Sequence, residues 1–166
     1  MKDENLFLIH IESILIKYGK IKEKIKKRYT FFFLLSYGET DMNIKVEINT
    51  RIWNENHYEI VNFFGIEMLV QDRSTLFANK LVALTDRSMV VNRDLYDTYF
   101  FFRNMFPINE AVIQERTGKN LKEYFIYLLD FIEKHVNRNN LLDGLGEVLD
   151  PKQKAFVKEK LYGELV

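Results

Sequence analysis

The sequence of 166 residues contains no cysteine. Disulfide bonds and cysteine-ligated zinc are therefore excluded, and this fits a reducing compartment, so we expect a cytoplasmic protein. Long apolar runs are missing as well. None approaches the roughly 20 residues that span a bilayer, and the first residues do not have the pattern of a signal peptide. We therefore expect no membrane partner.

Charge of one sign is not in excess, because 24 basic residues stand against 24 acidic ones. No overall field therefore indicates a nucleic-acid or membrane partner. Glycine-rich phosphate loops are missing too: neither G-x-G-x-x-G nor G-x-x-x-x-G-K-[ST] occurs, so dinucleotide-binding and P-loop folds have no support. The three histidines, His10, His57 and His135, are far apart and lack the spacing of metal ligands.

Proline is scarce, with two residues in all and none before Pro107. Nothing therefore argues against strands in the first hundred residues. The composition, 47% hydrophobic and 29% charged, is typical of a folded chain of about one domain. Residues 3–18 carry apolar side chains at helical spacing, β patterns follow, and helical patterns return from residue 72. These patterns predict an α+β fold.

About four strands, mostly in hairpins, are predicted before residue 72. Residues 29–37 form a nearly continuous apolar run, as expected of a strand covered on both faces. Residues 43–51 alternate between apolar and polar side chains, and residues 38–41 supply a turn that joins the two strands as a hairpin. Residues 57–63 and 66–71 have the pattern of two further short strands.

Helices are predicted from residue 72 onward. The first runs from a cap at Asp72 or Ser74 to about Arg87, and the second starts at Asn92 or Asp94 and ends before the proline at position 107. Three more are expected: a short one over residues 109–116 that ends near Gly118, a longer one over 121–136 with apolar side chains inward, and a last one from Asp150-Pro151 onward, with proline at the favoured first position.

A run of basic residues follows the first helix: Lys20, Lys22, Lys24, Lys26, Lys27 and Arg28. Such a run is typical of a solvated helix end or loop, and this is the expectation we adopt. Nucleic-acid contact is the weaker alternative, because no stacking aromatic side chains interleave with these cations.

The segment from Lys80 to Asp97 concentrates charge within a helical pattern. Lys80 and Arg87 are seven residues apart, which on one helix gives them nearly the same azimuth at about 10 Å separation. Lys80 stands among apolar residues and needs a partner, for which a phosphate and a salt bridge to Asp94 or Asp97 are equally open. Two cations on one stripe before an acidic helix start indicate a site for a phosphate and a metal ion or a proton.

Asp94 and Asp97 are predicted in the first turn of a helix, with Arg93 and Tyr96 beside them. The helix macrodipole favours negative charge there, so capping alone explains such residues. A carboxylate in this place could instead act as a general base, provided that it lies within hydrogen-bond reach of a reacting hydroxyl.

Glu47 lies on the polar face of a strand that we expect to be internal, between Lys45 and Asn49. A carboxylate that rises from a sheet can hold Mg²⁺, because this ion prefers oxygen ligands and keeps several waters. The alternative is an exposed glutamate on a half-solvated sheet face.

Three segments occur in a fixed order: IKVEINTR at 44–51, LFANKLVAL at 76–84 followed by Arg87, and RDLYDTYF at 93–100. Together they resemble the AbiEii family of nucleotidyltransferases, the toxin side of bacterial type IV toxin–antitoxin and abortive-infection systems. The resemblance covers roughly residues 5–135. It implies a polymerase-β-like nucleotidyltransferase fold, a nucleoside triphosphate substrate, magnesium as cofactor, an acceptor such as RNA, and an antitoxin protein as partner.

The resemblance also implies an organisation. Residues 1–71 would be a partial nucleotidyltransferase-like helix and sheet, and residues 72–166 would be a helical bundle packed on it, in one compact unit.

By position, the resemblance implies roles for the charged residues. Glu47 would be a catalytic, metal-binding carboxylate, and Asp94 a catalytic or site-organising one. Lys80 would hold the triphosphate with Arg87 nearby. The remaining candidates are the supporting residues Arg93 and Asp97, and Lys45 and Arg51, which could line the same cleft and contact the nucleotide.

The sequence departs from the family at its amino-terminal end. Members begin with a Gly-Gly-Thr or Gly-Ser turn followed by an Asp-x-Asp pair that binds the catalytic metals, and neither motif occurs here. One of three expected metal-binding carboxylates is then present, so we expect a remnant or carboxy-terminal part of a magnesium-dependent nucleotidyltransferase toxin that is inactive alone. The alternative is a non-catalytic module that binds a nucleotide, RNA or an antitoxin.

Self-association is a further expectation. In family members, the amino-terminal segment with the Gly-Gly-Thr and Asp-x-Asp motifs would supply part of the cover of the strand at residues 29–37. Without that segment, an apolar face or a sheet edge is left exposed. We therefore expect a homo-oligomer formed through that strand.

Overall fold

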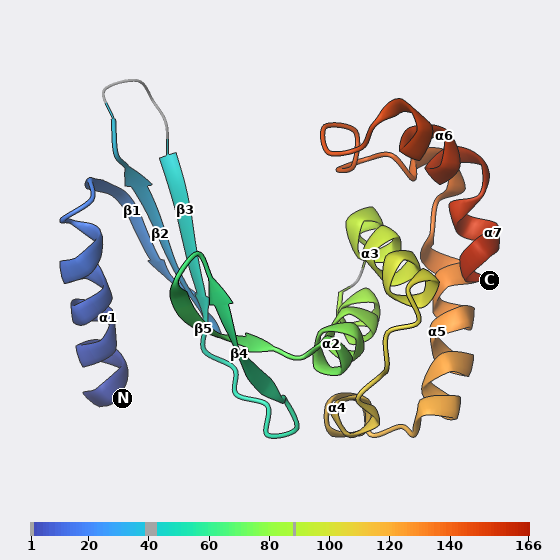
Figure 1. Cartoon of the computed structure of the whole chain (residues 1–166), viewed down its shortest axis with the longest axis horizontal. Helices are drawn as coiled ribbons and strands as arrows, with labels where there is room; N and C mark the ends of the chain where they lie inside the picture. The colour runs from blue at the N-terminus through green and yellow to red at the C-terminus, as the bar shows by residue number, and fades with distance from the viewer. Residues whose placement is uncertain (1, 39–42, 88) are drawn as a thin grey trace. The chain divides into compact units, whose positions relative to one another are not determined.

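The computed structural model describes residues 2–38, 43–87 and 89–166, and it confirms the α+β class. Its described strands are all antiparallel and form a three-stranded and a two-stranded sheet, followed by helices (Figure 1). The prediction of about four strands was therefore one strand short. Contacts divide the chain into two compact units, Met1–Ile52 and Trp53–Val166, and each is described by itself.

The first unit is a helix packed on a sheet. Helix α1 (Lys2–Leu15) is followed by strands β1 (Lys20–Lys26), β2 (Thr30–Ser36) and β3 (Asn43–Asn49), in the order β1-β2-β3. The predicted hairpin of β2 and β3 is confirmed, with a register in which the residue pairs run from Thr30–Asn49 to Ser36–Asn43. The turn expected at 38–41 falls mainly outside the described residues.

Most of the lysine run was assigned wrongly, because residues 20–26 form an edge strand, and only Lys27 and Arg28 lie in a turn. β1 pairs along its length with the apolar β2, so its backbone groups gain partners that the local sequence does not announce. Lysine side chains suit an exposed edge, since they discourage pairing with another chain.

The apolar run in β2 is buried, as a strand covered on both faces requires. Phe31 and Phe33 form a core with Leu8 of α1, onto which further apolar side chains of α1 and β3 pack. Phe32, on the opposite face, is buried as well. The expectation of an exposed apolar face on this strand was therefore wrong. The homo-oligomer stays a prediction, but this face is not available as its interface.

The second unit opens with a hairpin of β4 (Tyr58–Phe63) and β5 (Ile66–Gln71) that forms its own sheet. Its turn uses positive φ angles at Phe64 and Gly65, as a tight two-residue hairpin turn requires. Many of its apolar side chains are exposed, including Phe64 at 91%.

Helices make up the rest of the second unit: α2 (Arg73–Thr85), α3 (Asn92–Arg103), α4 (Glu110–Thr117), α5 (Leu121–His135), η1 (Arg138–Asn140), α6 (Pro151–Glu159) and α7 (Leu161–Leu165). Asp72 caps α2 as predicted, and its side chain accepts from the Thr75 backbone N–H. That hydrogen bond is the main reason why the pKa of Asp72 lies below its ordinary value. Two helices end before the predicted residue, α2 at Thr85 instead of about Arg87 and α3 at Arg103 instead of just before Pro107. The predicted last helix is two helices, divided at Lys160.

The core of this unit is formed mainly by the inward faces of α2, α3, α4 and α5. Tyr124 of α5 is fully buried, and its hydroxyl donates to the Leu81 carbonyl of α2 at 2.7 Å. Burial raises the pKa of Tyr124 to about 12, so the phenol stays a neutral donor. No described helix is long and apolar enough to cross a membrane.

Gly19, between α1 and β1, provides a direct test of the first unit. A Cβ atom there would lie 2.2 Å from the Ser36 carbonyl oxygen, so Gly19→Ala forces the backbones apart. We expect it to lower the free energy of unfolding by about 1–3 kcal/mol, measured by urea denaturation. Gly38→Ala is the control, because no atom of the described residues beyond its chain neighbours lies within 4 Å of a Cβ at that position. Equal stability of the two variants would contradict the close approach.

Candidate functional site

Four charged side chains of the second unit meet between α2 and α3. The Lys80 ammonium lies 2.9 Å from Asp94 Oδ1 and 2.9 Å from Asp97 Oδ2. The Arg87 guanidinium lies 3.6 Å from Asp94 Oδ2. We call these four residues the ion cluster. A salt bridge of Lys80 with Asp94 or Asp97 was one of the alternatives in the sequence analysis. Arg87 joins these three residues through Asp94.

Local structure explains why these side chains converge. Asp94 and Asp97 are three residues apart on α3, so they lie on the same side of the helix and both reach one ammonium group. Lys80 is followed on α2 by Leu81 and Val82, which are fully buried, and this places the root of its side chain at the edge of the core. The long methylene stem can then follow apolar surface to the carboxylates.

The cluster is partly withdrawn from water. The exposed side-chain fractions are 28% for Lys80, 10% for Asp94 and 35% for Asp97. Burial by itself would lower the pKa of Lys80, but the hydrogen bonds and charges of the two aspartates outweigh it, so the pKa is raised above its ordinary value. Its charge, and the stability that it adds, therefore persist below pH 10.5 and are lost only as the pH rises through the raised pKa.

One atom of the cluster is left without a hydrogen bond. Asp94 Oδ2 is buried and has no hydrogen-bond partner among the described residues, since the Arg87 contact at 3.6 Å is too long for one. A buried carboxylate oxygen in this state can accept a closer donor or ligate a hard cation. The described residues include no group of three or more histidine, aspartate or glutamate side chains that could hold a metal ion.

The geometry corrects parts of the sequence reasoning about this cluster. Arg87 lies beyond the end of α2, so its alignment with Lys80 does not follow from helical spacing. Asp94 is in the first turn of α3, but Asp97 is in the second, and neither caps the helix. Of the two partners left open for Lys80, the salt bridge is present, and it joins both aspartates.

The other candidates take no part in these ion pairs. Arg93 is exposed at the start of α3. Glu47 is half exposed and lies 3.3 Å from Lys45, and β3 is an edge strand of the described sheet, so the expectation of an internal strand was wrong. Arg51 lies over the ring of Tyr29. Glu47, Lys45 and Arg51 belong to the first unit, so a site shared with the ion cluster stays a prediction.

Sequence reasoning missed a second network that holds the same part of α2. Arg116 of α4 forms an ion pair with Asp86, donates to Asn79 Oδ1 at 2.6 Å, and lies over the ring of Trp53 at 5.2 Å. Asn79 and Asp86 directly precede Lys80 and Arg87 in the sequence. The network therefore holds the residues that directly precede both cations of the ion cluster. Arg116 is 37 residues from Asn79 and 30 residues from Asp86 in the sequence, and no local pattern connects them.

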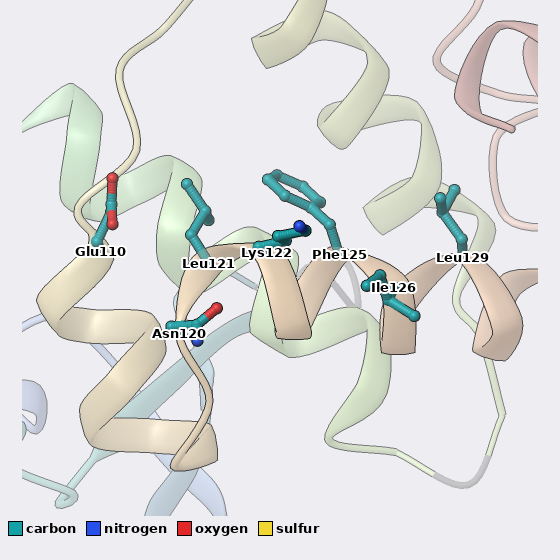
Figure 2. Close-up of a pocket in the computed structure, with 7 residues that line it drawn as sticks. All are labelled: Glu110, Asn120, Leu121, Lys122, Phe125, Ile126 and Leu129. Atoms are coloured by element: carbon teal, nitrogen blue, oxygen red, sulfur yellow. The ribbon is translucent and has the colours of Figure 1, made fainter.

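The second unit also contains cavities. A cavity of about 660 Å³ lies against α5, where Leu121, Phe125 and Leu129 project from one side of the helix (Figure 2). A second, of about 270 Å³, shares Phe125 and Leu129. A third, of about 410 Å³ and more polar, is lined by residues 89–92 before and at the start of α3 together with residues around the end of α5. The lining of this third cavity includes Asn92, two residues before Asp94.

Comparison with known proteins supplies the family. The family model described as "Nucleotidyl transferase AbiEii toxin, Type IV TA system" matches residues 4–163. The chain belongs to this family. The match extends beyond the 5–135 expected from the three segments and includes all four residues of the ion cluster. No curated protein and no solved structure gives a significant match.

The ion cluster can be tested as a structural element of this AbiEii protein. Lys80→Met leaves the buried Asp94 with one distant partner, so we expect a loss of about 2 kcal/mol in the free energy of unfolding, less than for a fully buried pair because Lys80 is partly exposed. The double variant Lys80→Met/Asp94→Leu removes both charges and should recover most of that loss.

The control is Lys134→Met, which breaks the exposed ion pair with Asp130 on α5 and should cost at most about 0.5 kcal/mol. Urea denaturation measures all three variants. If Lys80→Met costs no more than Lys134→Met, the cluster does not hold α2 to α3.

Proposed function

We propose that the ion cluster of this AbiEii-family chain binds the triphosphate of a nucleoside triphosphate. The observation that carries the proposal is the pair of cations, Lys80 and Arg87, held by the same buried carboxylate. Membership of a nucleotidyl transferase toxin family supports a phosphate ligand for these two cations. Lys80 stays charged across the physiological pH range, as a triphosphate ligand requires.

Charge balance indicates how the nucleotide would bind. Two cations and two carboxylates make the cluster neutral, so a bare triphosphate gains little net attraction from it. A triphosphate that carries Mg²⁺ is less negative, and Asp94 Oδ2 is an oxygen of the kind that this ion prefers. When bound, Mg²⁺ would neutralise charge on the phosphate oxygens. Lys80 and Arg87 would then turn from the aspartates toward the phosphates, and the third cavity would take the base or the sugar.

The wider assignment carries the family roles onto this chain. Glu47 would be a catalytic carboxylate and metal ligand, Lys45 and Arg51 would contact the nucleotide, and Arg93 and Asp97 would support the site. The acceptor of the transferred nucleotide would be RNA, and an antitoxin would counteract the protein in the cytoplasm. The chain would act as a homo-oligomer.

We further propose that this polypeptide by itself binds nucleotide but transfers none detectably. Its sequence contains no Asp-x-Asp pair, and in-line displacement at phosphorus with two metals needs more carboxylates than Glu47 and Asp94 supply. The chain would then serve as part of a larger catalytic assembly. The second candidate function is a non-catalytic module that binds a nucleotide, RNA or an antitoxin. The ion cluster favours it as well, because its cations are already paired with its carboxylates and the cluster is neutral.

Calorimetry tests nucleotide binding. Loss of a charge-assisted contact costs about 1.5–3 kcal/mol, so Lys80→Gln should weaken binding of Mg²⁺–ATP or Mg²⁺–CTP about tenfold or more. Lys134→Gln is the matched control, because it removes a lysine from an aspartate ion pair elsewhere in the same unit. Asp97→Asn makes the cluster net positive and should strengthen binding of metal-free nucleotide. No heat at millimolar nucleotide from the unmodified chain would contradict the proposal.

A transfer assay tests the proposed inactivity. With radiolabelled nucleoside triphosphates, Mg²⁺ and total RNA, we expect no labelled product from this chain alone. Turnover that is abolished by Glu47→Ala would contradict this expectation and establish catalysis by the chain itself.

A further inference from the structure

The end of the three-stranded sheet at which β1 turns into β2 gathers cations around a tyrosine. Tyr29 lies in this turn, and its carbonyl accepts from the Thr50 backbone N–H at 3.0 Å, which brings the residues after β3 beside it. The guanidinium of Arg28 lies 5.0 Å, and that of Arg51 5.4 Å, from the centre of the Tyr29 ring. Together with Lys27 these residues form a surface that we call the basic turn.

The basic turn is open to solvent and positively charged. Lys27, Arg28 and Arg51 are exposed, and Tyr29 is 43% exposed. Residues 27–30 and 48–52 contain these three cations and no acidic residue.

The neutral total of the chain hides a division of charge. The first unit, Met1–Ile52, contains ten basic and seven acidic residues, a net charge of +3. The second unit contains 14 basic and 17 acidic residues, a net charge of −3. A polyanion would therefore meet attraction on the first unit although the whole chain has no net charge.

The tyrosine removes the objection that the sequence raised against nucleic acid. No aromatic side chain interleaves with the lysine run itself, but folding places Tyr29 close to two arginine side chains from different segments, at 5.0 Å and 5.4 Å from the centre of its ring. Bases of single strands stack on aromatic rings and on guanidinium planes, while lysine and arginine neutralise the phosphates. A duplex keeps its bases stacked on one another and offers no free base to the ring.

Protection of a sheet edge explains part of the basic run but not the basic turn. Lysines along β1 discourage pairing with another chain, and Lys24 also forms an ion pair with Glu12 of α1. Lys27, Arg28 and Arg51 lie outside the strands, where no edge needs protection.

We propose that the basic turn binds a single-stranded polynucleotide, with a base stacked at Tyr29 and phosphates held by Lys27, Arg28 and Arg51. The polynucleotide would be the acceptor of the transferred nucleotide, and in this respect the inference rests on the proposed function. The binding itself does not require the ion cluster, because all the residues concerned belong to the first unit.

Fluorescence anisotropy of the full chain with a labelled oligouridylate of about 12 nucleotides tests the proposal. The measurement is made without nucleotide or Mg²⁺, at salt concentrations between about 50 and 200 mM. Tyr29→Leu should weaken binding about fivefold or more without a change in salt dependence, and Tyr29→Phe, which keeps the ring, should bind as the unmodified chain does. Tyr37→Leu is the control, since Tyr37 flanks the other end of β2 and is 47% exposed.

The cations have a different signature. The double variant Arg28→Gln/Arg51→Gln removes two phosphate contacts, so the slope of log K against log salt should become shallower by about 1.4. Lys152→Gln/Lys158→Gln on α6 makes the same change of charge on exposed residues of the second unit and should leave the slope unchanged. Thermal melts confirm that each variant is folded.

Competing ligands complete the test. Single-stranded DNA of the same length and a duplex RNA are titrated in parallel. Tighter binding of either single strand than of the duplex supports the proposal, and the tighter of the two shows whether the ligand is RNA or DNA. Absence of binding at low salt, equal affinity for the duplex, or equal effects of Tyr29→Leu and Tyr37→Leu would overturn it. So would a Tyr29-dependent affinity for heparin, which has no bases. Lys80→Gln should not affect oligonucleotide binding, so failure here and failure of nucleotide binding at the ion cluster are distinguishable.

Discussion

The shared ammonium of Lys80 is the constraint on which the functional part of the second unit depends. One lysine satisfies two carboxylates of α3 at 2.9 Å, and this ties α2 to α3 through charge where the core ties them through apolar contact. A buried Asp94 is tolerable only while a cation stays close. Asp94 Oδ2 accepts no hydrogen bond from the described residues and Lys80 remains charged, so both could take a further partner.

The surroundings of the ion cluster restrain it from the other side of α2. Arg116 draws Asn79 and Asp86 toward α4, and these residues are the direct neighbours of Lys80 and Arg87. Thr75 adds a fixed point at the start of the helix, since it is fully buried and its hydroxyl accepts from the His57 backbone N–H. Helix α2 is thus held by hydrogen bonds and ion pairs along its length, as the proposed phosphate-binding role of Lys80 would require.

Much of the fold followed from local pattern. The alternation in residues 43–51 and the apolar run in 29–37 predicted β3 and β2, and Asp72, Asn109 and Asp150 begin helices where their side chains can cap them. The prediction for the lysine run was wrong, because β1 forms by pairing with β2 and not through the β propensity of its own residues. The role of Arg116 was missed for a related reason: its partners are distant in the sequence, and a single arginine carries no periodic signal.

By itself, the sequence determined which residues could carry charge chemistry and to which family the chain belongs, because the segments with Glu47, Lys80 and Asp94 are read along the chain. The tertiary structure decided how those charges are used. It joined Lys80 to both aspartates, placed Arg87 beyond its helix, and brought Arg51 to Tyr29 across the sheet end. Contacts of this kind depend on distances across separate elements, and residue type and spacing do not contain those distances.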